Sequence, residues 1–338
     1  MNRKTRIWNG AVLLFCALSL LGSLLLVDRP AKLVGALRNA HPAFLLGAVG
    51  CMVGYWLLEA AGLHLATRRL YPAQRLKDSV TIAMIGQLFN CVTPFASGGQ
   101  PAQVMGLMRR GMPAGKASSA LVSKFIVYQT VLSLYSLAAL AGRANFAQLH
   151  GITPLLLTGF AVNTLVMAGL IAICCFPSAS RRFALWAIRM CARLRLCRSP
   201  EEAKQRALRE LQAFYESFLQ LRRSPGLLFL LAILSALQLT AFFAAPYFIC
   251  RALGAGLTFA AAVCAGAFVL MISSFVPLPG GSGGAEGGFF LFFHLFFPSA
   301  ALVGLALLLW RSVTFYLPIV AGGCFWASDK HFRLCQPV

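Results

Sequence analysis

Four charged side chains lie within otherwise apolar stretches of the sequence: Glu59, Lys124, Glu286 and Arg311. The chain has nine acidic residues in all, and the others fall in polar stretches or at their edges. A charged group at the centre of a lipid bilayer costs roughly 2.5–3.5 kcal/mol on insertion scales, and such groups usually pair with each other. We therefore expect two buried ion pairs, Glu286 with Arg311 and Glu59 with Lys124.

The position of each residue along its apolar run supports both pairs. Arg311 is central in its run, and Glu286 begins the segment just before it. Glu59 and Lys124 each lie eight or nine residues from a basic cluster, which at 1.5 Å per helical residue places both about 12 Å inside one membrane boundary. Lys124 has a second interpretation, in which its long side chain extends toward the lipid headgroups.

Glycine and proline interrupt two apolar stretches, residues 80–108 and 258–297. The first break reads TPFASGGQPAQ and the second VPLPGGSGGAE. Each glycine-rich turn is expected to lead into a helix N-terminus, where unpaired N–H groups and a partial positive charge attract anions such as phosphate or carboxylate. The glycines also have a simpler interpretation, because they permit tight turns and close helix packing.

The candidate substrate-binding residues combine these two turns with the four charged side chains. The absence of side chains at the glycines would let an anion approach the amides, and neutral polar groups surround the first turn. The full set is Glu59, Ser97, Gly98, Gly99, Gln100, Gln103, Lys124, Gly283, Gly284, Glu286 and Arg311.

The composition is that of an integral membrane protein. Of 338 residues, 59% are hydrophobic and 12% are charged, and the mean hydropathy is +0.75, whereas about a quarter of the residues in a soluble domain are charged. Six apolar runs reach the length of about 20 residues that a helix needs to cross the hydrocarbon layer. They are residues 7–27, 44–66, 117–141, 152–176, 227–249 and 299–323.

Basic residues gather in alternate loops, at residues 3–6, 68–77, 109–116 and 178–225. Such an asymmetry is typical of the cytoplasmic side of a membrane protein. We therefore expect both termini in the cytoplasm. The net charge of +21 is expected to face anionic lipid headgroups rather than nucleic acid.

With this orientation, residues 80–108 enter and leave the membrane from the cytoplasmic side, and residues 258–297 do so from the other side. The predicted fold is all-α, with about six transmembrane helices and two re-entrant helical hairpins in an inverted-repeat arrangement, which puts the substrate site near the bilayer midplane. The alternative is that both stretches are ordinary proline-kinked spans. We expect a single polytopic membrane domain over residues 1–338.

Residues 178–225 are expected to form a cytoplasmic, basic, amphipathic helical insert. Between Arg181 and Arg198 there are six arginines and no acidic residue, which is typical of a helix that lies on an anionic membrane surface. A second helix is expected to begin at Pro200, and its apolar stripe indicates that it packs on another element. A connector that holds the loop at the membrane is favoured over a substrate-binding role.

Motifs for catalysis or cofactor binding are absent. The sequence has no Walker A loop, no GxGxxG after a strand, no HExxH and no nucleophile elbow. Its eleven cysteines are scattered without the spacing of metal ligands. We therefore expect a protein that is not an enzyme and that uses no metal or cofactor.

The motifs TPFASGGQPAQV and VPLPGGSGGAEGGF, with Arg109 and Arg110 after the first, resemble the lysylphosphatidylglycerol synthase transmembrane family of flippase-like proteins. The resemblance covers nearly the whole chain. In larger relatives this module precedes a soluble aminoacyl-transferase domain and moves the modified lipid across the membrane. This sequence ends at Val338, soon after its last predicted span, so we expect a stand-alone member without transferase activity and leave the lipid open.

The residues and the resemblance together predict translocation of a phospholipid, or of another lipid-linked anion, through a polar groove between the re-entrant helices. Without an ATP motif, this movement would be down-gradient or ion-coupled, with Glu286 as the expected protonation site. Two other interpretations remain. One is a lipid-presenting accessory subunit or intramembrane enzyme of envelope lipid synthesis, such as that of hopanoids or polyprenyl-linked sugars. The other is a secondary transporter of a small anion.

Overall fold

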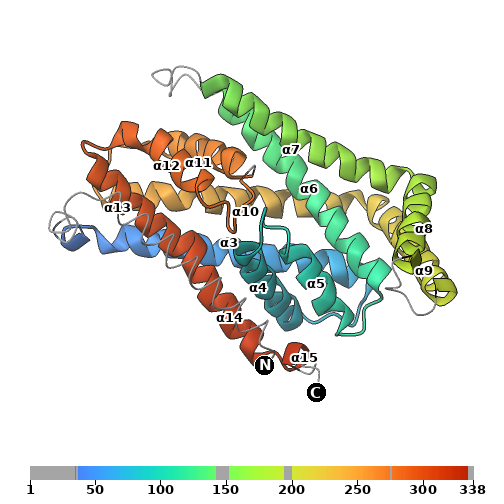
Figure 1. Cartoon of the computed structure of the whole chain (residues 1–338). Helices are drawn as coiled ribbons and strands as arrows, with labels where there is room; N and C mark the ends of the chain where they lie inside the picture. Colours follow the sequence, from blue (N-terminus) through green and yellow to red (C-terminus); the bar gives the residue numbers. More distant parts are fainter. Residues whose placement is uncertain (1–34, 36, 142–151, 194–199, 275, 334–338) are drawn as a thin grey trace.

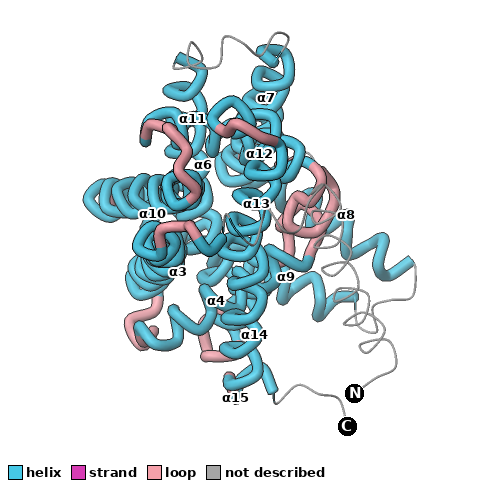
Figure 2. The backbone as a smooth tube through the Cα atoms, turned by 90° about the vertical axis from the view of Figure 1, so that its left-hand side faces the viewer, coloured by secondary structure: helices cyan, strands magenta, loops and turns pink. Residues whose placement is uncertain are grey.

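The computed structural model describes residues 35, 37–141, 152–193, 200–274 and 276–333. Over these residues the secondary structure is helical, with loops between the helices (Figure 1; Figure 2). Five helical segments are long and apolar enough to cross a membrane, and they match five of the six predicted spans. The predicted span at residues 7–27 lies outside the described residues. The five are α3 (Pro42–Leu70), α6 (Ala114–Ala141), α7 (Ile152–Cys175), α10 (Pro225–Ala252) and the pair α13 (Ala300–Arg311) and α14 (Leu317–Ser328).

Helices α3 and α10 pack side by side along the length of the bundle (Figure 1). They run antiparallel, because the N–H of His41, just before α3, donates to the carbonyl oxygen of Ala252 at the end of α10, at 3.1 Å. The C-terminal ends of α3 and α10 therefore mark the two opposite ends of the bundle, and each predicted hairpin can be assigned to one of them.

The first hairpin consists of α4 (Leu76–Val92) and α5 (Gly99–Met108), which pack against each other. It begins and ends at one end of the bundle, since Leu70 of α3 and Ala117 of α6 are buried in the same hydrophobic cluster. The ten residues of α5 extend about 15 Å, half of the hydrocarbon thickness. Residues 80–108 therefore form the predicted re-entrant hairpin and not a kinked span.

The second hairpin consists of α11 (Phe259–Ser273) and α12 (Gly284–Phe293), followed by a 3-10 turn, His294–Phe296. Cys250 of α10 and Val303 of α13 share a buried cluster with side chains from both hairpin helices. This hairpin therefore begins and ends at the C-terminal end of α10, opposite the first hairpin. The prediction of two hairpins in an inverted arrangement is confirmed.

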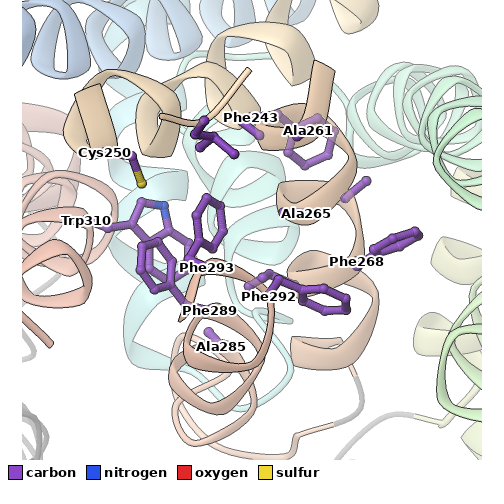
Figure 3. Close-up of a cluster of buried hydrophobic side chains, with 14 of the residues drawn as sticks. Phe243, Cys250, Ala261, Ala265, Phe268, Ala285, Phe289, Phe292, Phe293 and Trp310 are labelled. Carbon is purple, nitrogen blue, oxygen red and sulfur yellow. The ribbon is translucent and has the colours of Figure 1, made fainter. Parts of the chain in front are cut away.

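Aromatic side chains fill the cluster that holds the second hairpin. Phe289 stacks on Phe293 and on Trp310, with ring centroids 4.2 and 5.0 Å apart, and Phe268 packs against Phe292 (Figure 3). All four phenylalanines are fully buried. Aromatic pairs of this kind contribute about 0.5–1.5 kcal/mol beyond the burial of their surface, so α12 is fixed firmly against α11 and α13.

The turns at the two hairpin tips share the conformation of their first residues and differ at the last, where Gly98 has a φ of −79° and Gly283 a φ of 86°. Each begins with a proline, Pro94 or Pro279, and reaches the first residue of the following helix five positions later. The two residues after each proline have a positive φ, 54° and 51° in the first turn and 61° and 62° in the second. The tips also meet, since Pro94 and Pro279 form an antiparallel β-bridge. The resemblance between the two breaks in sequence is thus a resemblance in geometry.

The basic insert forms two helices, α8 (Pro177–Arg193) and α9 (Pro200–Arg222). Helix α9 packs along α6, as its apolar stripe predicted. The Glu210 carboxylate accepts a hydrogen bond of 2.6 Å from the N–H of Gly115, at the start of α6. The carboxylate thus satisfies a donor at a helix N-terminus, where negative charge is favourable. Residues 194–199, between the two helices, lie outside the described residues.

The C-terminal part of the chain holds the first hairpin in place. Arg110, after α5, donates to Asp78 of α4 at 2.9 Å and to Asp329 at 2.6 Å. Asp329 precedes the short helix α15 (Lys330–Arg333), and α14 packs against α4. A π-helical turn, Ser312–Tyr316, joins α13 to α14 directly after Arg311.

Candidate functional site

Glu59 of α3 and Lys124 of α6 form a buried ion pair, with 2.5 Å between Oε1 and Nζ. Each residue is only 8% exposed. Gln103 of α5 donates to the same carboxylate oxygen at 3.2 Å, and Gln238 of α10 donates to the other oxygen at 2.9 Å. The predicted pair is confirmed, and Lys124 does not extend toward the headgroups. Both carboxylate oxygens are satisfied, as a buried charge requires.

A cavity of about 820 Å³ lies next to this pair. Side chains from α3, α4, α5, α6, α7, α10 and α11 line it, together with the first tip. Its polar groups besides the ion pair are mostly neutral amides and tyrosines, among them Tyr55, Gln87, Asn90, Tyr128, Gln129 and Asn163. A polar cavity inside a bundle of apolar helices can replace the water around a charged or hydroxylated group.

The first tip contributes backbone donors to this cavity. Gly99 and Gln100, the first residues of α5, both line it. Among the described residues their backbone N–H groups make no hydrogen bond, whereas the N–H of Gly98 donates to Thr93 Oγ1 at 2.8 Å. A β-carbon at Gly99 would lie 2.0 Å from Oδ1 of Asn90. Glycine is therefore required there for the close approach of Asn90, as the packing interpretation predicted.

The second predicted ion pair is also present. Arg311 Nε donates to Glu286 Oε1 at 2.8 Å, and Nη2 lies 2.7 Å from the same oxygen. The guanidinium also donates to the carbonyl oxygen of Gly280 at 3.3 Å and lies between the rings of Trp310 and Phe315, at 5.3 and 5.2 Å from their centroids. Arg311 is 6% exposed. It thus anchors the second turn to the last span.

The second tip differs from the prediction that both tips present unpaired amides. The N–H of Gly283 donates to Glu286 Oε2 at 2.5 Å. The carboxylate of the chain itself therefore occupies the N-terminus of α12, because Glu286 is three residues beyond the helix cap, where a carboxylate bonds back to the capping residue. Glu286 takes the place that was predicted for an external anion.

The structure divides the predicted site residues into two groups. Glu59, Ser97, Gly99, Gln100, Gln103 and Lys124 line the cavity. Gly98 lies in the first turn and is not part of the cavity lining. Gly283, Gly284, Glu286 and Arg311 lie at the second tip, outside the cavity lining. The two groups are connected where the two prolines of the turns meet.

Several cavity residues were not predicted. Gln238 and Asn163 are isolated amides in apolar spans, and Tyr55 and Tyr128 lie one turn from Glu59 and Lys124. The same argument that selected the charged residues applies, more weakly, to an amide in an apolar run. Among the described residues, no three His, Cys, Asp or Glu side chains lie close enough together to hold a metal ion.

The match to known proteins covers both hairpins and the five spans. Residues 11–322 match the family described as the lysylphosphatidylglycerol synthase TM region. A UPF0104 membrane protein of Archaeoglobus fulgidus is 26% identical over 301 residues, which cover 85% of this chain and 86% of that protein. Because the family match spans most of the sequence, this multi-pass membrane protein belongs to the lysylphosphatidylglycerol synthase TM region family.

Proposed function

We propose that this protein moves an anionic lipid across the membrane by passing its headgroup through the polar cavity. The observation that carries the proposal is the cavity of about 820 Å³, which contains a buried ion pair inside a bundle of apolar spans. Sites for small molecules usually measure about 300–1,000 Å³, so the cavity suits a headgroup, while the acyl chains stay in the lipid.

The backbone amides of Gly99 and Gln100 and the ammonium group of Lys124 would receive the phosphate. They offer donors at a helix N-terminus and a positive charge, the combination that favours anions. Glu59 keeps the empty site neutral, since an unpaired buried lysine would be costly. When the phosphate arrives, it shares Lys124 with Glu59.

The second tip would bind the headgroup when the protein is open to the other side of the membrane. The hairpins are inserted from opposite ends and their turns begin with the same backbone conformation, which fits the architecture that transporters with inverted repeats use for alternating exposure. Separation of Glu286 from Arg311 would free the amide of Gly283 and the guanidinium for the headgroup. The Glu286 carboxylate would then take up a proton or pair with a cation, which provides a route to ion coupling.

The basic end of the molecule would face the cytoplasm of a bacterial inner membrane. The end of α3, the start of α6 and the helices α8 and α9 lie at the same end of the bundle (Figure 1). Helix α8, with the exposed Arg181, Arg182 and Trp186, is suited to lie on an anionic membrane surface. Positive charge on cytoplasmic loops is the general rule for multi-pass proteins.

The test is a flux measurement in vesicles that contain the purified chain. Headgroup-labelled phosphatidylglycerol is placed in one leaflet, and its appearance in the other is followed over time. The variant E59Q/K124Q keeps the cavity neutral but removes the positive charge, so its flux should fall at least ten-fold. The matched control is E201Q/K204Q, which removes an exposed ion pair of α9 and should leave the flux unchanged.

Equal flux in the wild type, in E59Q/K124Q and in vesicles without protein would contradict the proposal. A second measurement separates lipids from small anions. Vesicles loaded with inorganic phosphate should retain it, and rapid, protein-dependent loss of phosphate would support the transporter of a small anion instead.

A further inference from the structure

We propose that the headgroup accepted by the cavity carries one phosphate and an uncharged, hydroxyl-rich group such as a sugar or cyclic polyol, and that cationic headgroups are disfavoured. This inference rests on the proposed function, because it assigns the cavity to a lipid headgroup. It follows from the charges, the neutral polar groups and the donors that face the cavity.

The cavity has no carboxylate available for a cation. Glu59 and Lys124 are its charged residues among those that the structure describes, and they neutralise each other. Oε1 of Glu59 already accepts from Lys124 and Gln103, and Oε2 accepts from Gln238. An ammonium group would have to compete with Lys124 for the same carboxylate, and two cations beside one anion in a buried site repel each other.

Apart from the ion pair, the polar part of the lining consists of neutral groups that both donate and accept hydrogen bonds, and the remaining lining residues are apolar. A primary amide carries two donors and an acceptor, and a hydroxyl group is likewise both donor and acceptor, so amides can pair with hydroxyls in either direction. Tyrosine and serine hydroxyls add groups of the same kind. The residues are Gln87, Asn90, Ser97, Gln100, Gln129 and Asn163, with Tyr55 and Tyr128 beside them.

The donors for a single phosphate lie at one side of this polar surface. Gly99 and Gln100 provide two backbone N–H groups without an acceptor in the described structure, and Lys124 provides the charge. One phosphodiester, with a charge of −1, matches this supply. Gln129 donates to Asn163, and the other polar atoms of the lining amides remain for hydroxyl groups. A sugar or polyol phosphate therefore satisfies more of the lining than a bare phosphate or an aminoacylated headgroup.

The experiment compares the binding of four probes to the purified chain in a neutral detergent. The probes are phosphatidylinositol, phosphatidic acid, lysylphosphatidylglycerol and soluble inositol 1-phosphate. Phosphatidylinositol should bind at least ten-fold more tightly than lysylphosphatidylglycerol. It should also bind roughly three- to ten-fold more tightly than phosphatidic acid, which corresponds to one or two net hydrogen bonds to hydroxyl groups.

The variant Q100A tests the role of the amides directly. It should weaken phosphatidylinositol binding about three-fold or more and leave phosphatidic acid binding unchanged, since it keeps the backbone donors and Lys124. The matched control is Q212A, because Gln212 is an exposed glutamine on α9. It should bind all four probes like the wild type.

Tighter binding of lysylphosphatidylglycerol than of phosphatidylinositol would overturn the inference, and so would equal losses for phosphatidylinositol and phosphatidic acid in Q100A. If inositol 1-phosphate binds as tightly as phosphatidylinositol, the headgroup chemistry is supported and the lipid source is rejected. Selective binding of phosphatidylinositol without flux in vesicles would reject the proposed transport while leaving the headgroup preference in place.

Discussion

Ser97 and Ser282 occupy equivalent positions in the two turns, and each hydroxyl donates to the carbonyl oxygen of the proline three residues earlier, at 2.9 Å in both cases. The equivalence includes the two positive φ values that precede each serine. The second turn has glycine at those two positions, whereas the first has Phe95 and Ala96. The two turns therefore share these left-handed conformations, which glycine adopts readily in the second turn and which Phe95 and Ala96 adopt less readily in the first.

This difference predicts opposite effects of exchanging alanine and glycine in the two turns. A non-glycine residue in the left-handed region destabilises the folded state by roughly 1–2 kcal/mol. Glycine avoids this strain, but its greater freedom in the unfolded chain offsets about 0.5–1 kcal/mol of the gain. A96G should therefore stabilise the protein by up to about 1 kcal/mol. G281A should destabilise it by at least that amount, since its β-carbon would also lie 3.0 Å from Ser273. The free energy of unfolding in detergent measures both, and a loss of stability in A96G would refute the account of strain.

The contributions of Glu286 and Arg311 to the free energy of unfolding should depend on each other. Removing one partner leaves a buried charge and costs about 3–5 kcal/mol, whereas replacing both is often much less harmful. We expect R311M to be strongly destabilised and E286Q/R311M to recover part of the loss. E286Q alone should also be strongly destabilised, because it leaves the permanently charged Arg311 guanidinium buried without a carboxylate. The free energies of unfolding of the wild type, the two single variants and the double variant form a double-mutant cycle. Additive effects of the two substitutions would show that the residues do not interact.

Cysteine labelling should distinguish the two tips in this conformation. Ser97 is exposed and lines the cavity, while Ser282 is only 5% exposed. In a background without the eleven native cysteines, S97C should react with a water-soluble maleimide at least ten times faster than S282C. Addition of a lipid that occupies the cavity should slow S97C. Equal rates for the two positions, without an effect of lipid, would argue against a water-filled cavity at the first tip.

The contact between α9 and α6 predicts a local effect of a larger residue at position 115. A β-carbon at Gly115 would lie 2.2 Å from the carbonyl oxygen of Glu210, so G115A must push the two helices apart. We expect faster amide hydrogen exchange over residues 200–222, with little change over residues 225–252. E210Q, which keeps the shape and loses the charge at the helix N-terminus, should cost only about 0.5–1 kcal/mol. Unchanged exchange in G115A would show that the insert is not held by this contact.

The sequence was sufficient to predict the two ion pairs and the directions of the two hairpins. Intramembrane charges are rare, so each has few candidate partners, and depth along the helices selects among them. Gln238 was not predicted as a partner of Glu59, because 179 residues separate the two and only the packing of α3 on α10 brings them together. The hydrogen bond from the Gly283 N–H to Glu286 could have been predicted from the three-residue spacing of a helix cap. We instead predicted an external anion at this position. The extent of the cavity depends on the packing of seven helices, which no local pattern specifies.

The antiparallel bridge between Pro94 and Pro279 joins equivalent residues of the two hairpin turns. Self-complementary contacts of this type are those that two identical subunits make when they associate. A polypeptide of half this length that carried one hairpin and its flanking spans would therefore form the same contact by associating with a second copy in the opposite orientation. Duplication and fusion of such a unit would free each half to diverge, one toward Phe95 and Ala96 and the other toward glycine.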